Sequence, residues 1–213
     1  MDIFIYLFVA LFSVLNPIGT VPIFVGLTQG YTASERSKTS LVTSINVFII
    51  LMISFFVGQY VLSFFWLSIT ALRIAGGIII ASSGFSLLNG NFSKNKGINK
   101  KVQKEVEARQ HIALTPLAMP MLAGPGSISL LIAYYQELGE SGSAITSVEI
   151  LFSCLAILAV AVLIYIVLRS AHYLAKILGS SGIVAISRII GFLTIAIGIQ
   201  YIISATLSII RGI

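Results

Sequence analysis

The chain has 213 residues, of which 57% are hydrophobic and only 9% are charged. Soluble domains carry about 25% charged residues, so this composition excludes an ordinary water-soluble protein and predicts one compact membrane domain in a lipid bilayer. The net charge of +6 does not indicate nucleic-acid binding, because the basic residues lie in short segments between long apolar runs. A single cysteine, Cys154, excludes an internal disulfide framework and a cysteine metal site.

Apolar stretches of the length that crosses a bilayer, roughly 20 residues, occur six times along the chain, and their only charged residues are Arg73 and Glu149, near the starts of the third and fifth. We therefore predict an all-α membrane protein with six transmembrane helices. The joint between the second and third helices, around Ser63 to Thr70, is short and uncharged, so the alternative is a five-helix chain with one long, bent segment there. The six stretches are residues 3–27, 40–64, 71–90, 112–136, 148–168 and 189–210.

Lysine and arginine are distributed unevenly between alternate loops. With six helices, one side of the membrane holds eleven of the thirteen basic residues, and the other side holds only Arg73 and Arg211. Because cytoplasmic loops are the basic ones in membrane proteins, we expect both termini to lie outside the cytoplasm. The eleven residues are Arg36, Lys38, Lys94, Lys96, Lys100, Lys101, Lys104, Arg109, Arg169, Lys176 and Arg188.

The two halves of the chain resemble each other. The third helix opens with RIAGGIIIASSG at Arg73 and the sixth with RIIGFLTIAIGI at Arg188, and all five prolines fall in the first and fourth helices. Since each half has three helices, the second half enters the membrane from the opposite side, which predicts a 3+3 inverted-topology repeat. Repeat one is expected at 1–90, a cytoplasmic linker at 91–110 and repeat two at 111–213.

The first and fourth helices are predicted to be discontinuous, with breaks near mid-membrane at Asn16-Pro17 and Gly124-Pro125. Asparagine and glycine are acceptable helix N-caps and proline is favoured at the first helical position. A new half-helix is therefore expected to begin at each break. Depth in the membrane decides this pairing, because by sequence alone the other prolines of the fourth helix match nearly as well.

Two half-helix N-termini at mid-membrane predict a binding site for an anionic group. Unpaired backbone groups are tolerated at that depth only inside protein or beside a polar cavity, and free amides and the helix dipole attract anions. Secondary transporters hold substrate carboxylates in this way; the alternative is that the breaks only kink the helices for packing. The candidate substrate-binding residues are Asn16, Pro17, Gly19, Thr20, Gly124, Pro125, Gly126, Ser127 and Ile128, with the amides of Gly19, Thr20, Gly126, Ser127 and Ile128 and the hydroxyls of Thr20 and Ser127 expected to be free for the ligand.

Other polar residues are weaker candidates. Thr194 and Gln200 of the sixth helix could line the same cavity, but interhelical hydrogen bonding explains each of them better. Arg73 and Arg188 occupy equivalent places in the repeats and are expected to anchor their helices.

The sequence lacks the residues that several kinds of chemistry require. Apart from Glu149 at the start of the fifth span, no Asp or Glu lies within a predicted span, no nucleophile and base lie near each other there, and no Cys/His cluster or P-loop occurs. We therefore expect no enzymatic activity, no cofactor, no metal site and no direct use of ATP.

Four segments carry a resemblance to a known family: LNPIGTVPIF at 15–24, SERSKT at 34–39, RIAGGIIIASSGF at 73–85 and PLAMPMLAGPGSIS at 116–129. With them the sequence resembles the MarC family of bacterial and archaeal inner-membrane proteins, also grouped as the neutral amino acid transporter family. The resemblance implies six spans, a place in the cytoplasmic (inner) membrane, transport of small neutral amino acids such as glycine and alanine, and proton coupling.

The function we expect is secondary transport of a small neutral amino acid bound between the two broken helices. The alternatives are a channel or exporter for another small solute, and a non-transporting membrane scaffold whose breaks are dry and packed. The sequence leaves open the exact substrate, the direction of transport, the coupling ion (proton or sodium) and whether the chain forms a homo-oligomer.

Overall fold

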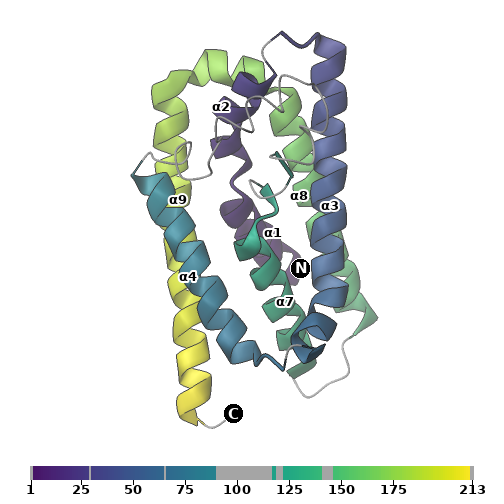
Figure 1. Cartoon of the computed structure of the whole chain (residues 1–213), viewed down its shortest axis with the longest axis vertical. Helices are drawn as coiled ribbons and strands as arrows, with labels where there is room; N and C mark the ends of the chain where they lie inside the picture. The colour runs from purple at the N-terminus through teal and green to yellow at the C-terminus, as the bar shows by residue number, and fades with distance from the viewer. Residues whose placement is uncertain are drawn as a thin grey trace.

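The computed structural model describes residues 2–28, 30–64, 66–89, 117–118, 122–140 and 146–211. Within these ranges the chain forms helices and no strands, as the composition predicts (Figure 1). The predicted linker and the prolines at positions 116 and 120 lie outside the described residues. The helices are α1 (Asp2–Leu15), α2 (Pro17–Leu27), α3 (Ala33–Phe64), α4 (Ile69–Leu88), α7 (Pro125–Glu140), α8 (Ser147–Arg169) and α9 (Ala171–Arg211).

Five helical segments are long and apolar enough to cross a membrane, and they overlap five of the six predicted spans. The remaining predicted span, 112–136, is described only in part, and the helix within it, α7, begins at Pro125. The protein is thus an all-helical membrane protein, and the sixth span stays a prediction. The five segments are Ile3–Val21, Ala33–Phe64, Ile69–Leu88, Ser147–Arg169 and Val184–Ile210.

The joint between α3 and α4 is a real helix boundary. Trp66 lies there with φ 54° and a side chain that is 95% exposed, and the Ser68 hydroxyl oxygen accepts a hydrogen bond from the Ala71 amide at 3.1 Å. This serine cap supplies an acceptor for one of the backbone amides that have no partner at a helix start. The alternative of one long, bent segment is therefore wrong.

The helix α3 begins seven residues before its predicted start at residue 40. Thr32 and Glu35 form a capping box, in which the Thr32 amide donates to the Glu35 carboxylate at 2.7 Å and the Glu35 amide donates to the Thr32 hydroxyl at 3.2 Å. The prediction placed the start after the last charged residue. The cap instead extends the helix beyond the apolar span.

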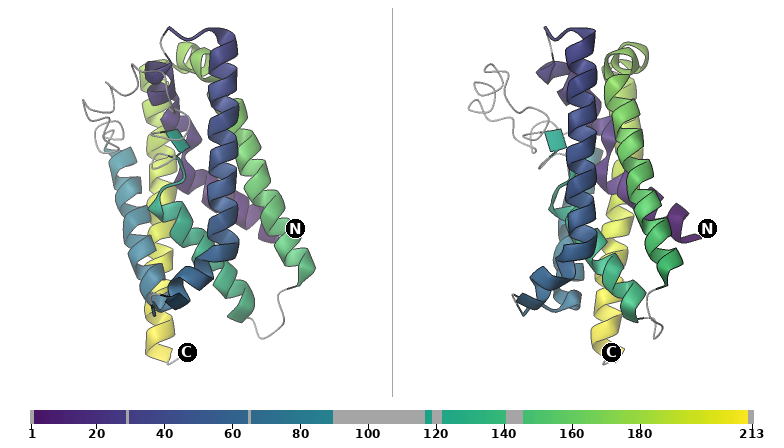
Figure 2. Two further views of the ribbon diagram at one scale, coloured as in Figure 1. Left: turned by 45° about the vertical axis from the view of Figure 1, so that its right-hand side comes forward. Right: turned by 90° about the vertical axis from the view of Figure 1, so that its right-hand side faces the viewer.

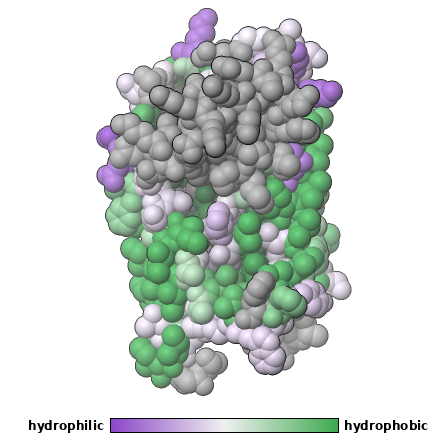
Figure 3. Space-filling model, in the orientation of Figure 1, coloured by the Kyte–Doolittle hydropathy of each residue, from purple (hydrophilic) through white to green (hydrophobic). Residues whose placement is uncertain are grey.

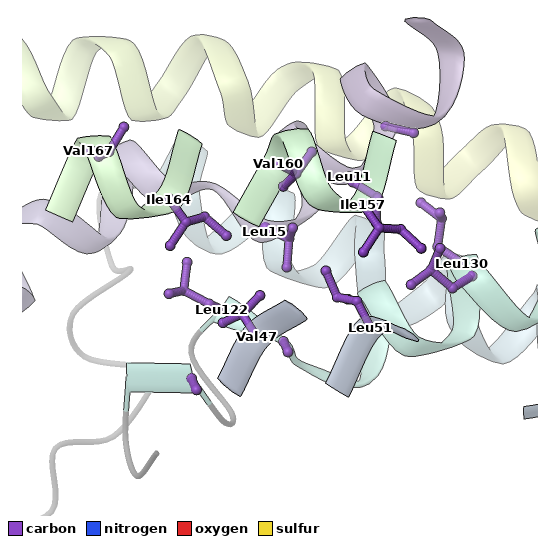
Figure 4. Packing of buried hydrophobic residues seen from close by; sticks show 14 of the residues in the cluster. Leu11, Leu15, Val47, Leu51, Leu122, Leu130, Ile157, Val160, Ile164 and Val167 are labelled. Atoms are coloured by element: carbon purple, nitrogen blue, oxygen red, sulfur yellow. The ribbon is translucent and has the colours of Figure 1, made fainter. Parts of the chain in front are cut away.

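Each of the helices next to a break packs against the other half of the chain. The helices α1 and α2 contact α8 and α9, whereas α7 contacts α3 and α4 (Figure 2). Further contacts join α3 to α8 and α4 to α9. Large apolar side chains from α1, α3, α7 and α8 fill the core between them, among them Leu11, Leu51, Leu130 and Ile157 (Figure 4).

The helices α4 and α9 run antiparallel with their backbones in close contact. A methyl group added to Gly77 would lie 2.6 Å from the Gly198 carbonyl oxygen, and one added to Gly84 would lie 2.7 Å from the Gly191 carbonyl oxygen. Only glycine permits this approach, which is a common way of packing helices in membranes.

Charge separates the two ends of the bundle. The basic end carries Arg36, Lys38, Arg169, Lys176 and Arg188, while Arg73, Glu137 and Glu149 belong to the opposite end. Hydrophobic side chains dominate the flanks, and hydrophilic ones gather towards the upper end of the view (Figure 3). At the basic end α9 is interrupted by Gly179 at φ 61°, so its first two turns lie across the bundle and the rest runs beside α4 (Figure 1).

Candidate functional site

The first break is made by one residue, Asn16, which separates α1 from α2. Its backbone has φ 43° and ψ 65°, a left-handed conformation that asparagine tolerates better than most residues. Its side-chain oxygen accepts a hydrogen bond from the Gly19 amide at 3.2 Å. In a continuous helix that amide would have bonded to the Leu15 carbonyl, so the cap replaces the helical hydrogen bond. Pro17 then stands at the first position of α2, where no amide is needed.

The break also leaves the Ser13 carbonyl without its helical donor, because the residue four positions later is Pro17. The Thr194 hydroxyl of α9 lies 2.9 Å from this carbonyl and 2.8 Å from the Ile190 carbonyl of its own helix, so its one proton is shared between the two acceptors, and Thr194 is fully buried. The interhelical hydrogen-bonding interpretation of Thr194 therefore holds. The same interpretation is wrong for Gln200, since its side-chain amide donates to the Ser204 hydroxyl of its own helix at 3.2 Å.

The second break ends at Gly124, and α7 begins at Pro125. The Gly124 amide donates to the Leu122 carbonyl at 2.9 Å, and the Gly124 carbonyl accepts from the Ser127 amide at 3.1 Å, the Ser127 hydroxyl at 2.9 Å and the Ile128 amide at 3.2 Å. This break is thus closed mainly by its own backbone. The Gly126 amide finds no acceptor among the residues that the structure describes.

The two breaks approach each other inside the bundle. A methyl group added to Gly126 would lie 3.5 Å from Val14, two residues before Asn16, and 3.1 Å from Ile80 of α4. From this region α2 leads towards the basic end and α7 leads away from it (Figure 1). The N-terminal ends of two half-helices, each with a partial positive charge, therefore meet in the interior.

The structure corrects part of the predicted site. The amides of Gly19, Ser127 and Ile128 are not free, since they bond to the Asn16 side chain and the Gly124 carbonyl. The Thr20 hydroxyl donates to the Asn16 carbonyl at 3.3 Å, and the Ser127 hydroxyl likewise bonds within its own turn. The prediction was wrong here because it counted the orphan amides of a helix start without the acceptors that the capping residues supply.

One strong donor does remain at the breaks. The Asn16 side chain is 1% exposed, and its amide nitrogen has no hydrogen-bond partner within the described part of the chain. An unpaired buried donor costs free energy, on the order of 1–3 kcal/mol. Thr20 and Ser127 are equally buried, at 0% and 1% exposure. The Asn16 amide nitrogen is thus a buried donor that the described residues leave unpaired.

A second polar region, which we call the outer cluster, lies at the opposite end from the basic residues and consists of Tyr6, Arg73, Tyr134, Glu137 and Tyr201. Arg73 is only 7% exposed and pairs with Glu137 at 3.2 Å, joining α4 to α7. The rings of Tyr6 and Tyr134 lie 6.2 Å apart, and the Tyr201 hydroxyl donates to the Leu130 carbonyl at 3.4 Å.

Sequence reasoning missed the outer cluster. The predicted fourth span ends at residue 136, whereas α7 continues through Glu137, and Arg73 was expected to anchor a helix end, whereas it is buried in an ion pair. A signal was present: Leu130, Tyr134 and Glu137 follow the three- and four-residue spacing of one helix face. Arg188, which the predicted repeat pairs with Arg73, is exposed.

A cavity of about 330 Å³ borders the outer cluster between α1 and α9. Tyr6 and Tyr201 belong to both the cluster and the cavity wall, and the rest of the wall is mostly apolar. Its volume is within the range of small-molecule sites. The cavity is lined by Ile5, Tyr6, Val9, Ala10, Ile197, Gln200 and Tyr201.

Comparison with known proteins identifies the family. The chain matches a family described as MarC family integral membrane protein over residues 1–210. The chain belongs to the MarC family. The resemblance seen in the four sequence motifs is confirmed, and the protein is a multi-pass inner-membrane protein.

Three relatives of this MarC-family chain are similar over nearly their whole length. An Escherichia coli protein called UPF0056 inner membrane protein MarC is 39% identical, with 95% of this chain and 93% of its own covered. The E. coli UPF0056 membrane protein YhcE is 36% identical, with 97% and 93% covered. A UPF0056 membrane protein of Buchnera aphidicola is 40% identical, with 94% and 90% covered. These names state no substrate, and no solved structure matches the chain.

Proposed function

We propose that this MarC-family protein is a secondary transporter of small neutral amino acids of the glycine and alanine class. The substrate binds at mid-membrane between the two breaks, with its carboxylate near the starts of α2 and α7. The observation that carries this proposal is Asn16, a fully buried cap whose side-chain amide has no partner among the described residues. The Gly126 amide, which likewise has no acceptor among those residues, and the two half-helix dipoles favour the same anionic group.

The packing of the helices supports a 3+3 inverted repeat with discontinuous first and fourth helices. If α2, α3 and α4 correspond to α7, α8 and α9, the contacts match in pairs: α2 with α8 corresponds to α7 with α3, and α2 with α9 corresponds to α7 with α4. The α3–α8 and α4–α9 contacts then join equivalent helices. Transporters built in this way place their substrate where the repeats meet.

The charges of the two ends support one orientation. Cytoplasmic ends of membrane proteins are rich in lysine and arginine, so the basic end would face the cytoplasm and the outer cluster would face away from it. Both termini would then lie outside the cytoplasm. The outer cluster and the cavity beside it would form the non-cytoplasmic mouth of the transport path.

Uptake by purified protein tests the proposal. Reconstituted protein should take up labelled glycine or alanine, with imposed proton and sodium gradients compared in parallel. Asn16→Gly keeps the left-handed backbone and costs only a few tenths of a kcal/mol as a cap, but it removes the amide donor. Losing a hydrogen bond to a charged group, roughly 1.5–3 kcal/mol, should weaken apparent affinity by about 10- to 100-fold.

Thr206→Val is the matched control, because the Thr206 hydroxyl donates only to the Ile202 carbonyl of its own helix on the exposed face of α9. Uptake by this variant should equal that of the wild type. If Asn16→Gly took up the substrate with unchanged affinity, the substrate would not bind at the breaks. No uptake across the common amino acids would favour the alternative of a non-transporting scaffold, which the low exposure of Asn16, Thr20 and Ser127 also suits.

A further inference from the structure

A groove on the membrane-facing side of the bundle lies between α3 and α8, apart from the breaks and the outer cluster. It has a volume of about 200 Å³. At its base the Ser44 hydroxyl donates to the Ala161 carbonyl, so the polar groups there are satisfied and the floor presents apolar surface. The two walls are formed by Leu41, Ile45 and Phe48 of α3 and by Leu158, Val162 and Tyr165 of α8.

Each wall of the groove has a basic residue next to it on the same helix, and both basic residues lie at the basic end of the bundle. On α3, Lys38 lies three residues before Leu41, and on α8, Arg169 lies four residues after Tyr165. Residues three or four apart share one face of a helix, so both cations extend the stripes that line the groove. Both are exposed, and neither forms an ion pair within the described part of the chain.

Tyr165, a residue of the groove wall, holds the Arg169 side chain in place. One nitrogen of its guanidinium group donates to the Tyr165 hydroxyl at 2.5 Å, and the group lies 5.7 Å from the centre of the Tyr165 ring. The Tyr165 hydroxyl also interacts with Ser37 of the facing helix. An arginine has five N–H donors in a fixed fork, so the remaining donors stay available to a phosphate beside the groove.

We propose that this groove binds one anionic phospholipid, with an acyl chain between α3 and α8 and the phosphate between Lys38 and Arg169. The apolar walls match a hydrocarbon chain, and the two cations stand at the end of the groove where a headgroup lies. Phosphate is recognised well by arginine and lysine at such a place. The site is independent of the transport function proposed above.

Lipid retention by purified protein tests this site. Native mass spectrometry would compare phosphatidylglycerol with phosphatidylcholine of the same acyl chains, each added to the protein in detergent. A basic residue near an anionic headgroup contributes about fivefold in affinity, so the wild type should prefer phosphatidylglycerol by up to about 25-fold for one bound lipid. Lys38→Ala/Arg169→Ala should abolish the preference, and Tyr165→Phe should reduce it by releasing Arg169.

Two controls make the outcome decisive. Lys176→Ala/Arg188→Ala removes two basic residues of the same end that do not line the groove, and it should keep the preference. Val162→Trp fills the groove and should lower retention of both lipids. No preference in the wild type, or equal losses in the Lys38/Arg169 and Lys176/Arg188 variants, would overturn the site, since the basic residues would then act only as general interfacial anchors. None of these readouts requires transport activity.

Discussion

The breaks and the outer cluster are both polar regions inside an apolar bundle, but they satisfy their polar groups differently. At the breaks the groups are neutral, and most hydrogen bonds close within four residues, as between Asn16 and Gly19 or Ser127 and Gly124. In the outer cluster the groups are charged or aromatic and come from α1, α4, α7 and α9, so that Arg73 pairs with Glu137 across 64 positions of sequence. One region is built locally, the other only by the packed helices.

The breaks therefore need mainly local contacts, whereas the outer cluster needs helices from both halves of the chain to be packed together. Local caps can form as soon as each half-helix exists, whereas the Arg73–Glu137 pair requires α4 and α7 to be docked. A buried ion pair adds little net stability, but breaking it leaves an uncompensated charge. The breaks should therefore respond to backbone substitutions, and the outer cluster to changes in charge.

The largest effect is expected at the outer cluster. Arg73→Leu leaves Glu137 without its cation, and because the Glu137 side chain is 40% exposed the loss should be reduced by solvent, to about 2–3 kcal/mol of unfolding free energy. Arg73→Leu/Glu137→Leu should recover most of this loss. Denaturant unfolding in detergent measures both. A double variant as unstable as the single one would show that charge pairing is not what holds this region together.

The next largest effect is expected at the first break. Asn16→Ala places alanine at φ 43°, which costs about 1–2 kcal/mol, and removes a cap worth about 1 kcal/mol. Asn16→Gly should lose at most half as much, since glycine accepts the left-handed backbone. Thermal unfolding of the two variants gives the comparison. Equal losses would mean that strain is absent and that the cap alone matters.

The smallest effect is expected from hydroxyl removal. Thr194→Val deletes the donor that replaces the missing amide of Pro17, and interhelical hydrogen bonds in membranes are worth about 0.6–1.7 kcal/mol. Ser127→Ala removes a bond within one turn and should cost less, because the Gly124 carbonyl keeps two backbone donors. Unfolding free energies of both variants would rank them. A larger loss in Ser127→Ala would contradict the view that the second break is closed by its own backbone.

The sequence predicted the helices and the positions of the breaks from simple patterns. Apolar length, together with Asn16-Pro17 and Gly124-Pro125, placed helix starts at Pro17 and Pro125, where α2 and α7 begin. It did not predict that α3 extends to Ala33, since a capped helix continues past its apolar part. It also treated several amides as free, although these amides donate to the Asn16 side chain and the Gly124 carbonyl. Whether such acceptors lie within reach depends on local geometry rather than on residue type.

By itself the sequence determined that this is a helical membrane protein of the MarC family, that helices begin at Pro17 and Pro125 and how charge is divided between the ends of the described helices. These properties follow from composition and from neighbours along the chain. The tertiary structure alone decided that Thr194 supplies the Ser13 carbonyl, that Arg73 is buried against Glu137 and that Gly126 meets Val14. Such contacts join residues far apart in sequence, and they exist only where packed helices bring them within hydrogen-bonding or van der Waals distance.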